Sequence, residues 1–267
     1  MSTVVFLGGG RITSAMLAGL RLAKAKDHFI VHDRNPGKLR ELKKLYRLAV
    51  EPDLQRAASK ADLLIIAVRP DSVRDLLRNI RSISRPTLAV SLAAGIPLRL
   101  LSKSFGAPVR WARAMPSPVC RTGCGLTAVT FPGKLPQSDR KRVRDFFLSV
   151  GQVVEIPESK FDAFTVTYSS SHGYHALATL AEAAEEAGLD RKTALLASAH
   201  ALADGIIAWR KGKHSLQSLI EEAATPGGIA ATTLAGMDAA GYRRAVQKGV
   251  RDGLRRASFL LSLWSGA

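Results

Sequence analysis

The stretch Val4-Val5-Phe6-Leu7-Gly8-Gly9-Gly10-Arg11-Ile12-Thr13 decides how the first half of this chain folds. Four apolar residues, then three glycines, then a run with apolar residues at helical spacing are typical of a buried strand, a tight turn and a helix. Glycines let such a turn tighten and let its backbone approach a phosphate at the positive end of the helix. The stretch therefore predicts a dinucleotide-binding turn, in which Thr13 replaces the third small residue and costs some closeness between helix and strand.

The residues around this turn alternate between short apolar runs and amphipathic charged runs, which is the pattern of a parallel sheet with crossover helices. Prolines 36, 70 and 97 suit the first turns of helices. The predicted strands are 4–7, 29–32, 63–68, 87–92, 109–112, 125–131 and 152–155, and the predicted helices are 11–24, 37–46, 70–80, 96–104 and 136–149. We expect an α/β fold, a Rossmann-type doubly wound parallel sheet, in a dinucleotide-binding domain at residues 1–158.

From Phe161 onward the composition changes to long Ala- and Leu-rich stretches with helical periodicity and without alternating strands. Residues 159–267 therefore predict an all-α domain. Its helices near 176–187, 193–209 and 245–264 carry broad apolar faces that a domain of this size could hardly cover by itself, which favours a homodimer.

Composition excludes several classes of protein. Hydrophobic residues make up 46% and charged residues 23% of the 267 residues, as in ordinary globular proteins. The two cysteines, Cys120 and Cys124, are too few for a disulfide framework, and we expect no metal site. Neither a signal peptide nor a membrane span is visible, so a cytoplasmic protein is expected.

The net charge of +17 comes almost entirely from residues 1–160, which hold 28 Lys and Arg against 12 Asp and Glu. These cations are scattered singly along helix-like segments, without interleaved aromatic residues or a recognition helix. Nucleic-acid binding is therefore not expected, and an anionic cofactor or a solvated basic face explains the charge.

The second strand ends at Asp33, followed by Arg34 and Asn35. An acidic residue here usually accepts from the ribose 2′-hydroxyl of NAD, whereas a neighbouring arginine suits the 2′-phosphate of NADP. The two signals conflict, and the local positive charge favours NADP, with NAD as the alternative.

Several motifs in order resemble the pyrroline-5-carboxylate reductase family over nearly the whole length. The motifs are Gly8-Gly9-Gly10-Arg11-Ile12-Thr13-Ser14-Ala15-Met16, Ala67-Val68-Arg69-Pro70, Ser91-Leu92-Ala93-Ala94-Gly95-Ile96, Arg113-Ala114-Met115-Pro116-Ser117-Pro118, Glu182-Ala183-Ala184-Glu185-Glu186-Ala187-Gly188 and Thr225-Pro226-Gly227-Gly228. Several places depart from the family pattern, beginning with Ser117, which stands where the family usually has Asn. The family's S-G-S-G-P-A-Y is replaced by Ser170-Ser171-His172-Gly173-Tyr174-His175-Ala176, and the threonine after the T-P-G-G turn comes later than usual.

The resemblance implies a set of site residues. Those expected to bind the cofactor are Gly8, Gly10, Arg11, Ile12, Thr13, Asp33, Arg34, Asn35, Val68, Arg69, Pro70, Ala93, Gly95 and Met115. Those expected to bind the substrate are Ser170, Gly173, Thr225, Pro226, Gly227 and Gly228, because a turn that begins a helix offers N–H groups to a carboxylate. Candidate catalytic residues are Thr232, Thr233, Tyr174 and His172.

The activity that the resemblance implies is the reduction of 1-pyrroline-5-carboxylate to proline by hydride transfer from NAD(P)H, in a homodimer that could stack into a larger ring. The altered segment at 170–176 keeps two alternatives open. One is a related NAD(P)H-dependent reductase of another imine or a keto acid, and the other is a non-catalytic dinucleotide-binding regulatory protein. His172 and His175, three residues apart, could instead form a hydrogen-bonded pair at the dimer interface.

Overall fold

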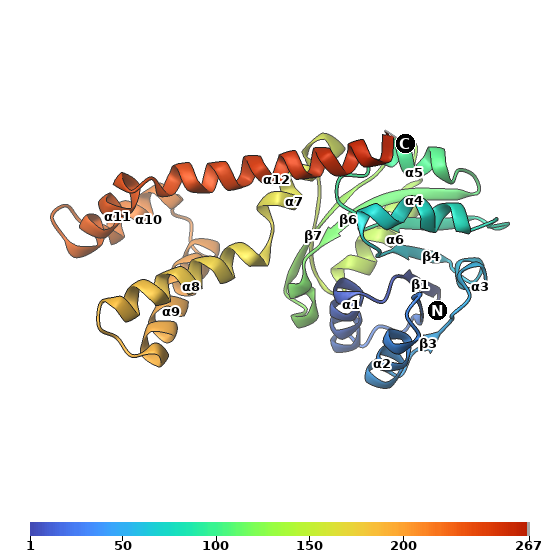
Figure 1. Ribbon diagram of the computed structural model, residues 1–267, viewed down its shortest axis with the longest axis horizontal. Coiled ribbons are helices and arrows are strands. Elements are labelled where there is room, and N and C mark those ends of the chain that lie inside the picture. The colour runs from blue at the N-terminus through green and yellow to red at the C-terminus, as the bar shows by residue number, and fades with distance from the viewer. Residues whose placement is uncertain (266–267) are drawn as a thin grey trace. The chain divides into compact units, whose positions relative to one another are not determined.

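The computed structural model describes residues 1–265, and within them one eight-stranded sheet and a set of helices make up the fold (Figure 1). The strands are β1 (Thr3–Leu7), β2 (His28–His32), β3 (Ala49–Val50), β4 (Leu63–Ile66), β5 (Thr87–Ser91), β6 (Val109–Pro116), β7 (Gly125–Thr130) and β8 (Gly151–Glu155). The helices among them are α1 (Arg11–Leu22), α2 (Pro36–Tyr46), α3 (Leu54–Ser59), α4 (Pro70–Asn79), α5 (Leu98–Ser104), α6 (Gln137–Leu148) and α7 (Phe161–Thr167), with short 3-10 turns η1 (Pro118–Thr122) and η2 (Glu158–Lys160). The helices that follow are α8 (Ser170–Glu186), α9 (Arg191–Lys211), α10 (Leu216–Ala223), α11 (Ile229–Ala239) and α12 (Tyr242–Ser265).

The strand order is β3-β2-β1-β4-β5-β6-β7-β8. Strands are added on one side of β1 up to β3 and on its other side from β4 onward. Every neighbouring pair is parallel except β6 and β7, which pair antiparallel from Arg113 opposite Thr130 to Pro116 opposite Thr127. The predicted doubly wound parallel sheet is therefore confirmed, with one antiparallel pair, β6 and β7, within it. The link between Pro116 and Gly125 is shorter than the ten or so residues that a helical crossover needs, so the chain turns back on itself.

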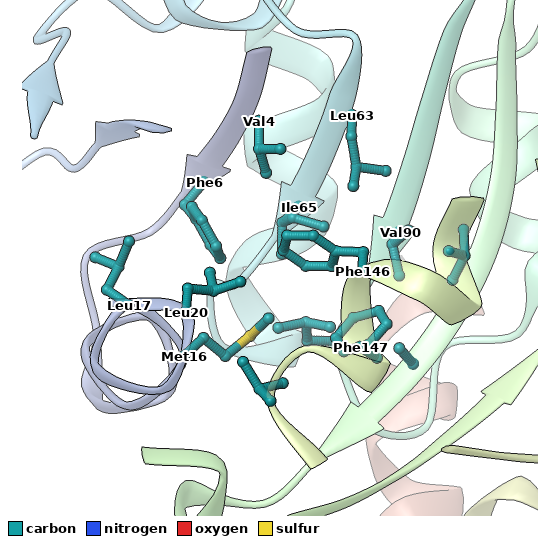
Figure 2. Close-up of a cluster of buried hydrophobic side chains, with 14 of the residues drawn as sticks. Val4, Phe6, Met16, Leu17, Leu20, Leu63, Ile65, Val90, Phe146 and Phe147 are labelled. Carbon is teal, nitrogen blue, oxygen red and sulfur yellow. The ribbon is translucent and has the colours of Figure 1, made fainter. Parts of the chain in front are cut away.

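Helices cover both faces of the sheet. One hydrophobic cluster packs α1, α2 and α6 against side chains such as Phe6, Ile65 and Val90, and Figure 2 shows Phe146 and Phe147 of α6 lying among them. The other cluster packs α3, α4 and α5 against the opposite side chains of the same strands, such as Val5, Leu64 and Ala89. Burial on both faces explains why these strands read as unbroken apolar runs rather than as alternating ones.

The expected elements are present, with shifted ends. β6 extends four residues beyond the predicted end at Ala112, because its pairing with β7 continues the ladder. β3 and α3 were not predicted, since two strand residues and one short helix carry no readable periodicity. Pro36 and Pro70 lie in the first turns of α2 and α4 as expected, whereas Pro97 precedes α5 as its N-cap residue.

The chain forms two compact units, which differ from the domains proposed from composition. The first contains Met1–Tyr168 together with the chain from Gly253 onward, and the second contains Ser169–Asp252. The composition changes near residue 158, but the segment after it packs on the sheet through Phe161, which is fully buried. The boundary between a dinucleotide-binding domain at residues 1–158 and a helical domain at residues 159–267 stays a prediction.

The second unit is helical, as predicted, and α8 begins at Ser170, six residues before the predicted start. Its helices α8 and α9 pack together, with Ala181, Ala194 and Ser198 as buried residues. Many large apolar side chains remain exposed, among them Leu196 at 59% and Ile206 at 54%. Exposed apolar side chains in this number favour coverage by another protein surface.

Two neighbouring residues of α6 test the packing in Figure 2, because Phe147 is 0% exposed and Leu148 is 52% exposed. We expect Phe147→Ala to lower the free energy of unfolding by about 3–5 kcal/mol, since it removes ring contacts and leaves a cavity. Leu148→Ala should change it by less than about 0.5 kcal/mol. Urea unfolding followed by circular dichroism measures both, and equal losses would contradict the described packing of α6.

Candidate functional site

The glycine turn joins β1 to α1 through a close approach of two backbones. Gly8 has a φ of +114°, and a Cβ on it would lie 2.8 Å from the carbonyl carbon and oxygen of Ala67. Its N–H donates to the His32 carbonyl oxygen at 2.8 Å, which ties the turn to the end of β2. Only glycine suits this position, because the conformation is left-handed and the space is taken.

Thr13 is fully buried, and its hydroxyl donates to the Gly8 carbonyl oxygen at 2.5 Å. Thr13 is expected to keep α1 slightly farther from β1, and its hydroxyl adds a hydrogen bond that connects the glycine turn to the first turn of α1. Tyr46, which the sequence analysis missed, adds a second fastening: its hydroxyl donates to the Ser14 carbonyl oxygen and lies 2.8 Å from the Ser14 hydroxyl. No local motif signals a partner 32 residues away.

Gly10 is the N-cap residue of α1, and a Cβ on it would meet nothing within 4 Å. The N–H groups in the first turn of a helix have no partner within the helix, and the helix dipole adds positive potential there. Arg11, which is exposed, and the half-buried Ile12 begin the same turn. These features fit a dinucleotide pyrophosphate, which needs N–H donors and an approach unhindered by a side chain.

Asp33 holds the turn from the neighbouring strand. Its Oδ2 accepts from the Gly9 N–H at 2.7 Å, its Oδ1 accepts from the Asn35 N–H at 2.8 Å, and Lys38 Nζ lies 4.0 Å from Oδ2. The Asn35 side chain caps α2 by accepting from the N–H groups of Gly37 and Lys38. Arg34 between them is exposed. Asp33 is thus partly committed to the scaffold, while the Arg34 guanidinium faces solvent beside it.

The other residues expected at the cofactor lie at the carboxyl ends of the central strands. Ala67 donates its N–H to the Leu7 carbonyl oxygen, and Val68, Arg69 and Pro70 lead directly into α4. The half-buried Met115 is the residue before the end of β6. Carboxyl ends of parallel strands meet at one edge of the sheet, where nucleotides bind in folds of this type.

Two residues of the motif at 91–96 have structural roles. Ala93 is buried and its N–H donates to the Ser91 hydroxyl. A Cβ on Gly95, whose φ is +72°, would lie 2.7 Å from the Ala257 carbonyl oxygen of α12. Gly95 is therefore needed for a close helix contact, whatever its part in cofactor binding.

The residues expected at the substrate lie in the second unit, at the beginnings of two helices. Ser170, His172, Gly173 and Tyr174 form the first turns of α8, and Tyr174 is 67% exposed. The four residues Thr225 to Gly228 form a turn in which the Gly228 N–H donates to the Thr225 carbonyl oxygen at 3.0 Å, and α11 begins directly afterwards.

Thr232 and Thr233 follow within the first two turns of α11. The Thr232 hydroxyl donates to the Gly228 carbonyl oxygen at 3.1 Å, and the Thr233 hydroxyl donates to the Ile229 carbonyl oxygen at 3.0 Å. Both threonines are exposed. Each hydroxyl has lone pairs free to accept, and it must rotate away from the helix carbonyl before it can donate to a ligand.

Two titratable groups outside these sets are strongly perturbed. Burial raises the pKa of the Cys120 thiol to about 11, so this cysteine stays protonated and unreactive at neutral pH. Hydrogen bonds from Lys60 and Arg56 lower the pKa of Glu51 to about 2. The same hydrogen bonds connect α3 and the residue after it to Glu51, which directly follows β3. Within the described residues, no group of three or more His, Cys, Asp and Glu side chains is arranged to hold a metal ion. No helix within them is long and apolar enough to cross a bilayer.

Comparison with known proteins matches each part of the chain to a family model. Residues 3–95 match a model described as NADP oxidoreductase, coenzyme F420-dependent, and residues 158–260 match one described as pyrroline-5-carboxylate reductase dimerisation. The fold and its glycine turn thus define a dinucleotide-binding oxidoreductase that carries a dimerisation domain.

Relatives narrow the class. The chain is 30% identical to a pyrroline-5-carboxylate reductase of Synechocystis sp. over 95% of its own length and 96% of that protein's. It is 32% identical to one of Corynebacterium melassecola, over 73% and 74% of the two chains. This chain belongs to the pyrroline-5-carboxylate reductase family. A Plasmodium falciparum pyrroline carboxylate reductase solved with NADP bound has the same fold, with a TM-score of 0.88 at 23% identity over 98% of each chain.

The glycine turn provides a test that separates scaffold from binding. Gly8→Ala should destabilise the protein by about 1–3 kcal/mol, because it places a Cβ against Ala67 in a strained conformation. Gly10→Ala should cost less than about 1 kcal/mol, since its φ is ordinary and its surroundings are open, yet its methyl group obstructs the approach of a phosphate. Thermal unfolding and titration calorimetry with NADPH measure the two effects, and an unweakened NADPH affinity in Gly10→Ala would contradict the assignment of this turn.

Proposed function

We propose that this protein reduces 1-pyrroline-5-carboxylate to proline, with hydride from NADPH. The observation that carries the proposal is the 30% identity to a reductase of that name along almost the entire length of both chains. The glycine turn, the open N-terminus of α1 and the positively charged Arg34 beside Asp33 support it independently.

The reduced nicotinamide supplies the hydride when it is bound, and this chain's residues bind and orient it. The first turn of α1 takes the pyrophosphate through N–H groups, with Gly10 leaving room for its approach. Asp33 already accepts hydrogen bonds from the chain itself at both carboxylate oxygens, which leaves it less able to bind a ribose 2′-hydroxyl. The exposed Arg34 guanidinium instead pairs with a 2′-phosphate. NADP(H) is therefore the preferred cofactor, and NAD(H) the weaker one.

The substrate carboxylate binds the turn Thr225-Pro226-Gly227-Gly228, where the first N–H groups of α11 point away from the helix. Ser170 and Gly173 at the start of α8 line the same substrate. Reduction of the C=N bond also needs a proton on nitrogen. A rotated Thr232 or Thr233 hydroxyl hydrogen-bonds at the imine nitrogen, Tyr174 or His172 delivers the proton, and most of the rate enhancement comes from positioning.

The protein acts as a homodimer. The exposed apolar side chains of the second unit, such as Leu196, Ile206 and Trp209, fit coverage by a second copy of a dimerisation domain. A larger ring of dimers and a cytoplasmic location stay predictions.

One observation favours a second candidate, a reductase of the same architecture that acts on another imine or a keto acid. The start of α8 carries His172 and Tyr174 where the family pattern has small residues, so the volume and polarity beside the substrate differ.

The activity is tested by following NADPH oxidation with pyrroline-5-carboxylate and with a panel of other cyclic imines and keto acids. We expect the highest kcat/KM with pyrroline-5-carboxylate. Thr232→Ala and Thr233→Ala made together should lower kcat about 10- to 100-fold if a threonine hydrogen-bonds at the imine nitrogen, since a hydrogen bond to a charged group contributes about 1.5–3 kcal/mol. The control is Thr179→Ala, which removes an exposed threonine elsewhere in the same unit. Higher turnover of another panel member identifies the second candidate, and no turnover of any of them identifies a non-catalytic binding protein.

Arg34 and Arg40 form a matched pair for testing cofactor preference, because both are exposed. Arg34 precedes α2 and lies beside Asp33, whereas Arg40 lies within α2. Arg34→Ala should weaken NADPH binding about 10- to 100-fold, since a charged hydrogen bond contributes about 1.5–3 kcal/mol. It should leave NADH binding unchanged, and Arg40→Ala should affect neither. Titration calorimetry decides, and equal weakening of both coenzymes by Arg34→Ala would remove the 2′-phosphate assignment.

A further inference from the structure

Arg113 of β6 is a buried cation that the reaction outlined above does not use. Only 2% of it is exposed, and it is among the largest fully buried side chains. A buried charge is retained only where it is paired, because desolvation penalises it heavily. Burial lowers the pKa of the Arg113 guanidinium, while the nearby carboxylates of Asp162 and Glu158 oppose that shift. Its partners therefore indicate what it holds.

Among the residues that the structure describes, the partners of the Arg113 side chain lie in the segment 158–162. Nη1 donates to Glu158 Oε1 at 3.2 Å, Nη2 lies 3.6 Å from Asp162 Oδ1, and the guanidinium carbon lies 4.3 Å from the centre of the Phe161 ring. Glu158 Oε1 also accepts from the Leu98 N–H at 2.7 Å, which caps α5 with a residue 60 positions away. The cation thus joins β6, the beginning of α5 and the beginning of α7.

The same segment is fastened again at its far end. The Leu126 N–H of β7 donates to the Tyr168 hydroxyl oxygen at 2.7 Å. Between the two fastenings, α7 lies beside α12 (Figure 1). The contact is close, since a Cβ on Gly253 of α12 would lie 2.7 Å from Val166 Cγ1 of α7. Residues 158–168 are consequently part of the sheet unit, and the chain leaves that unit after Tyr168.

We propose that Arg113 is a positioning residue for the reaction: through Glu158, Phe161 and Asp162 it fixes the segment from which the chain enters the helical unit. This inference rests on the proposed function, whose candidate substrate-binding and catalytic residues all follow this segment in the chain, in α8 and around the start of α11. Their reaction depends on reproducible positions, since a displacement of about 1 Å can reduce a rate about 100-fold.

The chain offers a matched control on the same strand. Arg110 of β6 pairs with Asp139 of α6, Nε to Oδ2 at 2.7 Å, and this pair does not involve the segment 158–168. Asp162→Asn and Asp139→Asn therefore each remove one aspartate charge from an arginine of β6, but only the first weakens the fastening of α7.

The experiment combines steady-state kinetics with hydrogen exchange of the full-length protein. Asp162→Asn should lower kcat for pyrroline-5-carboxylate about tenfold, with the Kd for NADPH within twofold of wild type. It should also accelerate exchange at residues 158–168. Asp162→Glu should restore kcat to within threefold of wild type, and Asp139→Asn should change neither kcat nor exchange in this segment.

The proposal is overturned if Asp162→Asn leaves kcat unchanged, if Asp139→Asn lowers kcat equally, or if exchange rises uniformly across the protein. A wild type that does not reduce pyrroline-5-carboxylate refutes the proposed function instead. The variants are then compared with the panel substrate that the wild type does reduce. If the wild type reduces none of them, hydrogen exchange alone is compared, and unchanged exchange at residues 158–168 in Asp162→Asn overturns the inference.

Discussion

The nucleotide-binding half of the molecule depends on the approach of Gly8 to the backbone of Ala67. A Cβ on Gly8 would lie 2.8 Å from the Ala67 carbonyl carbon and oxygen, closer than side-chain atoms approach a backbone, so the ends of β1 and β4 can lie this close only with glycine. The approach sets the direction in which α1 leaves the sheet, and Thr13 and Asp33 hold the turn by hydrogen bonds to Gly8 and Gly9. Direction and hydrogen bonding together place the positive end of α1 at the carboxyl edge of the sheet, where a pyrophosphate binds.

Charge has two separate uses in the sheet unit. On the surface, exposed cations such as Arg34 remain solvated and available to an anionic ligand. In the interior, Arg113 exchanges its hydration for two carboxylates and an aromatic ring, all from the segment that leads out of the unit. A buried ion pair of this kind adds little to stability compared with apolar packing, and its value lies in specifying one arrangement of the segment.

The helical unit shows the opposite balance, with helices that are well formed and a core that is sparse. Its buried residues are small, Ala181 and Ala194 among them, while larger side chains such as Leu196 remain on the surface. Helices within proteins gain most of their stability from packing an apolar face against other elements. A unit with this distribution is therefore consistent with the dimerisation domain whose model it matches, because a second copy supplies the missing surface.

Sequence by itself determined the glycine turn, the order of strands and helices in the sheet domain other than β3 and α3, the all-helical second half and the family resemblance. Each of these is recorded in local periodicity or in contiguous motifs. Tertiary structure alone decided the antiparallel β7, the role of Gly95 against Ala257, the support of α1 by Tyr46 and the burial of Arg113. Each of these depends on residues that are distant in the chain, and no local pattern records which of them meet. The same reason explains the ambiguity at Asp33: its type predicted a ligand for ribose, and only its hydrogen bonds to Gly9 and Asn35 revealed a scaffold role.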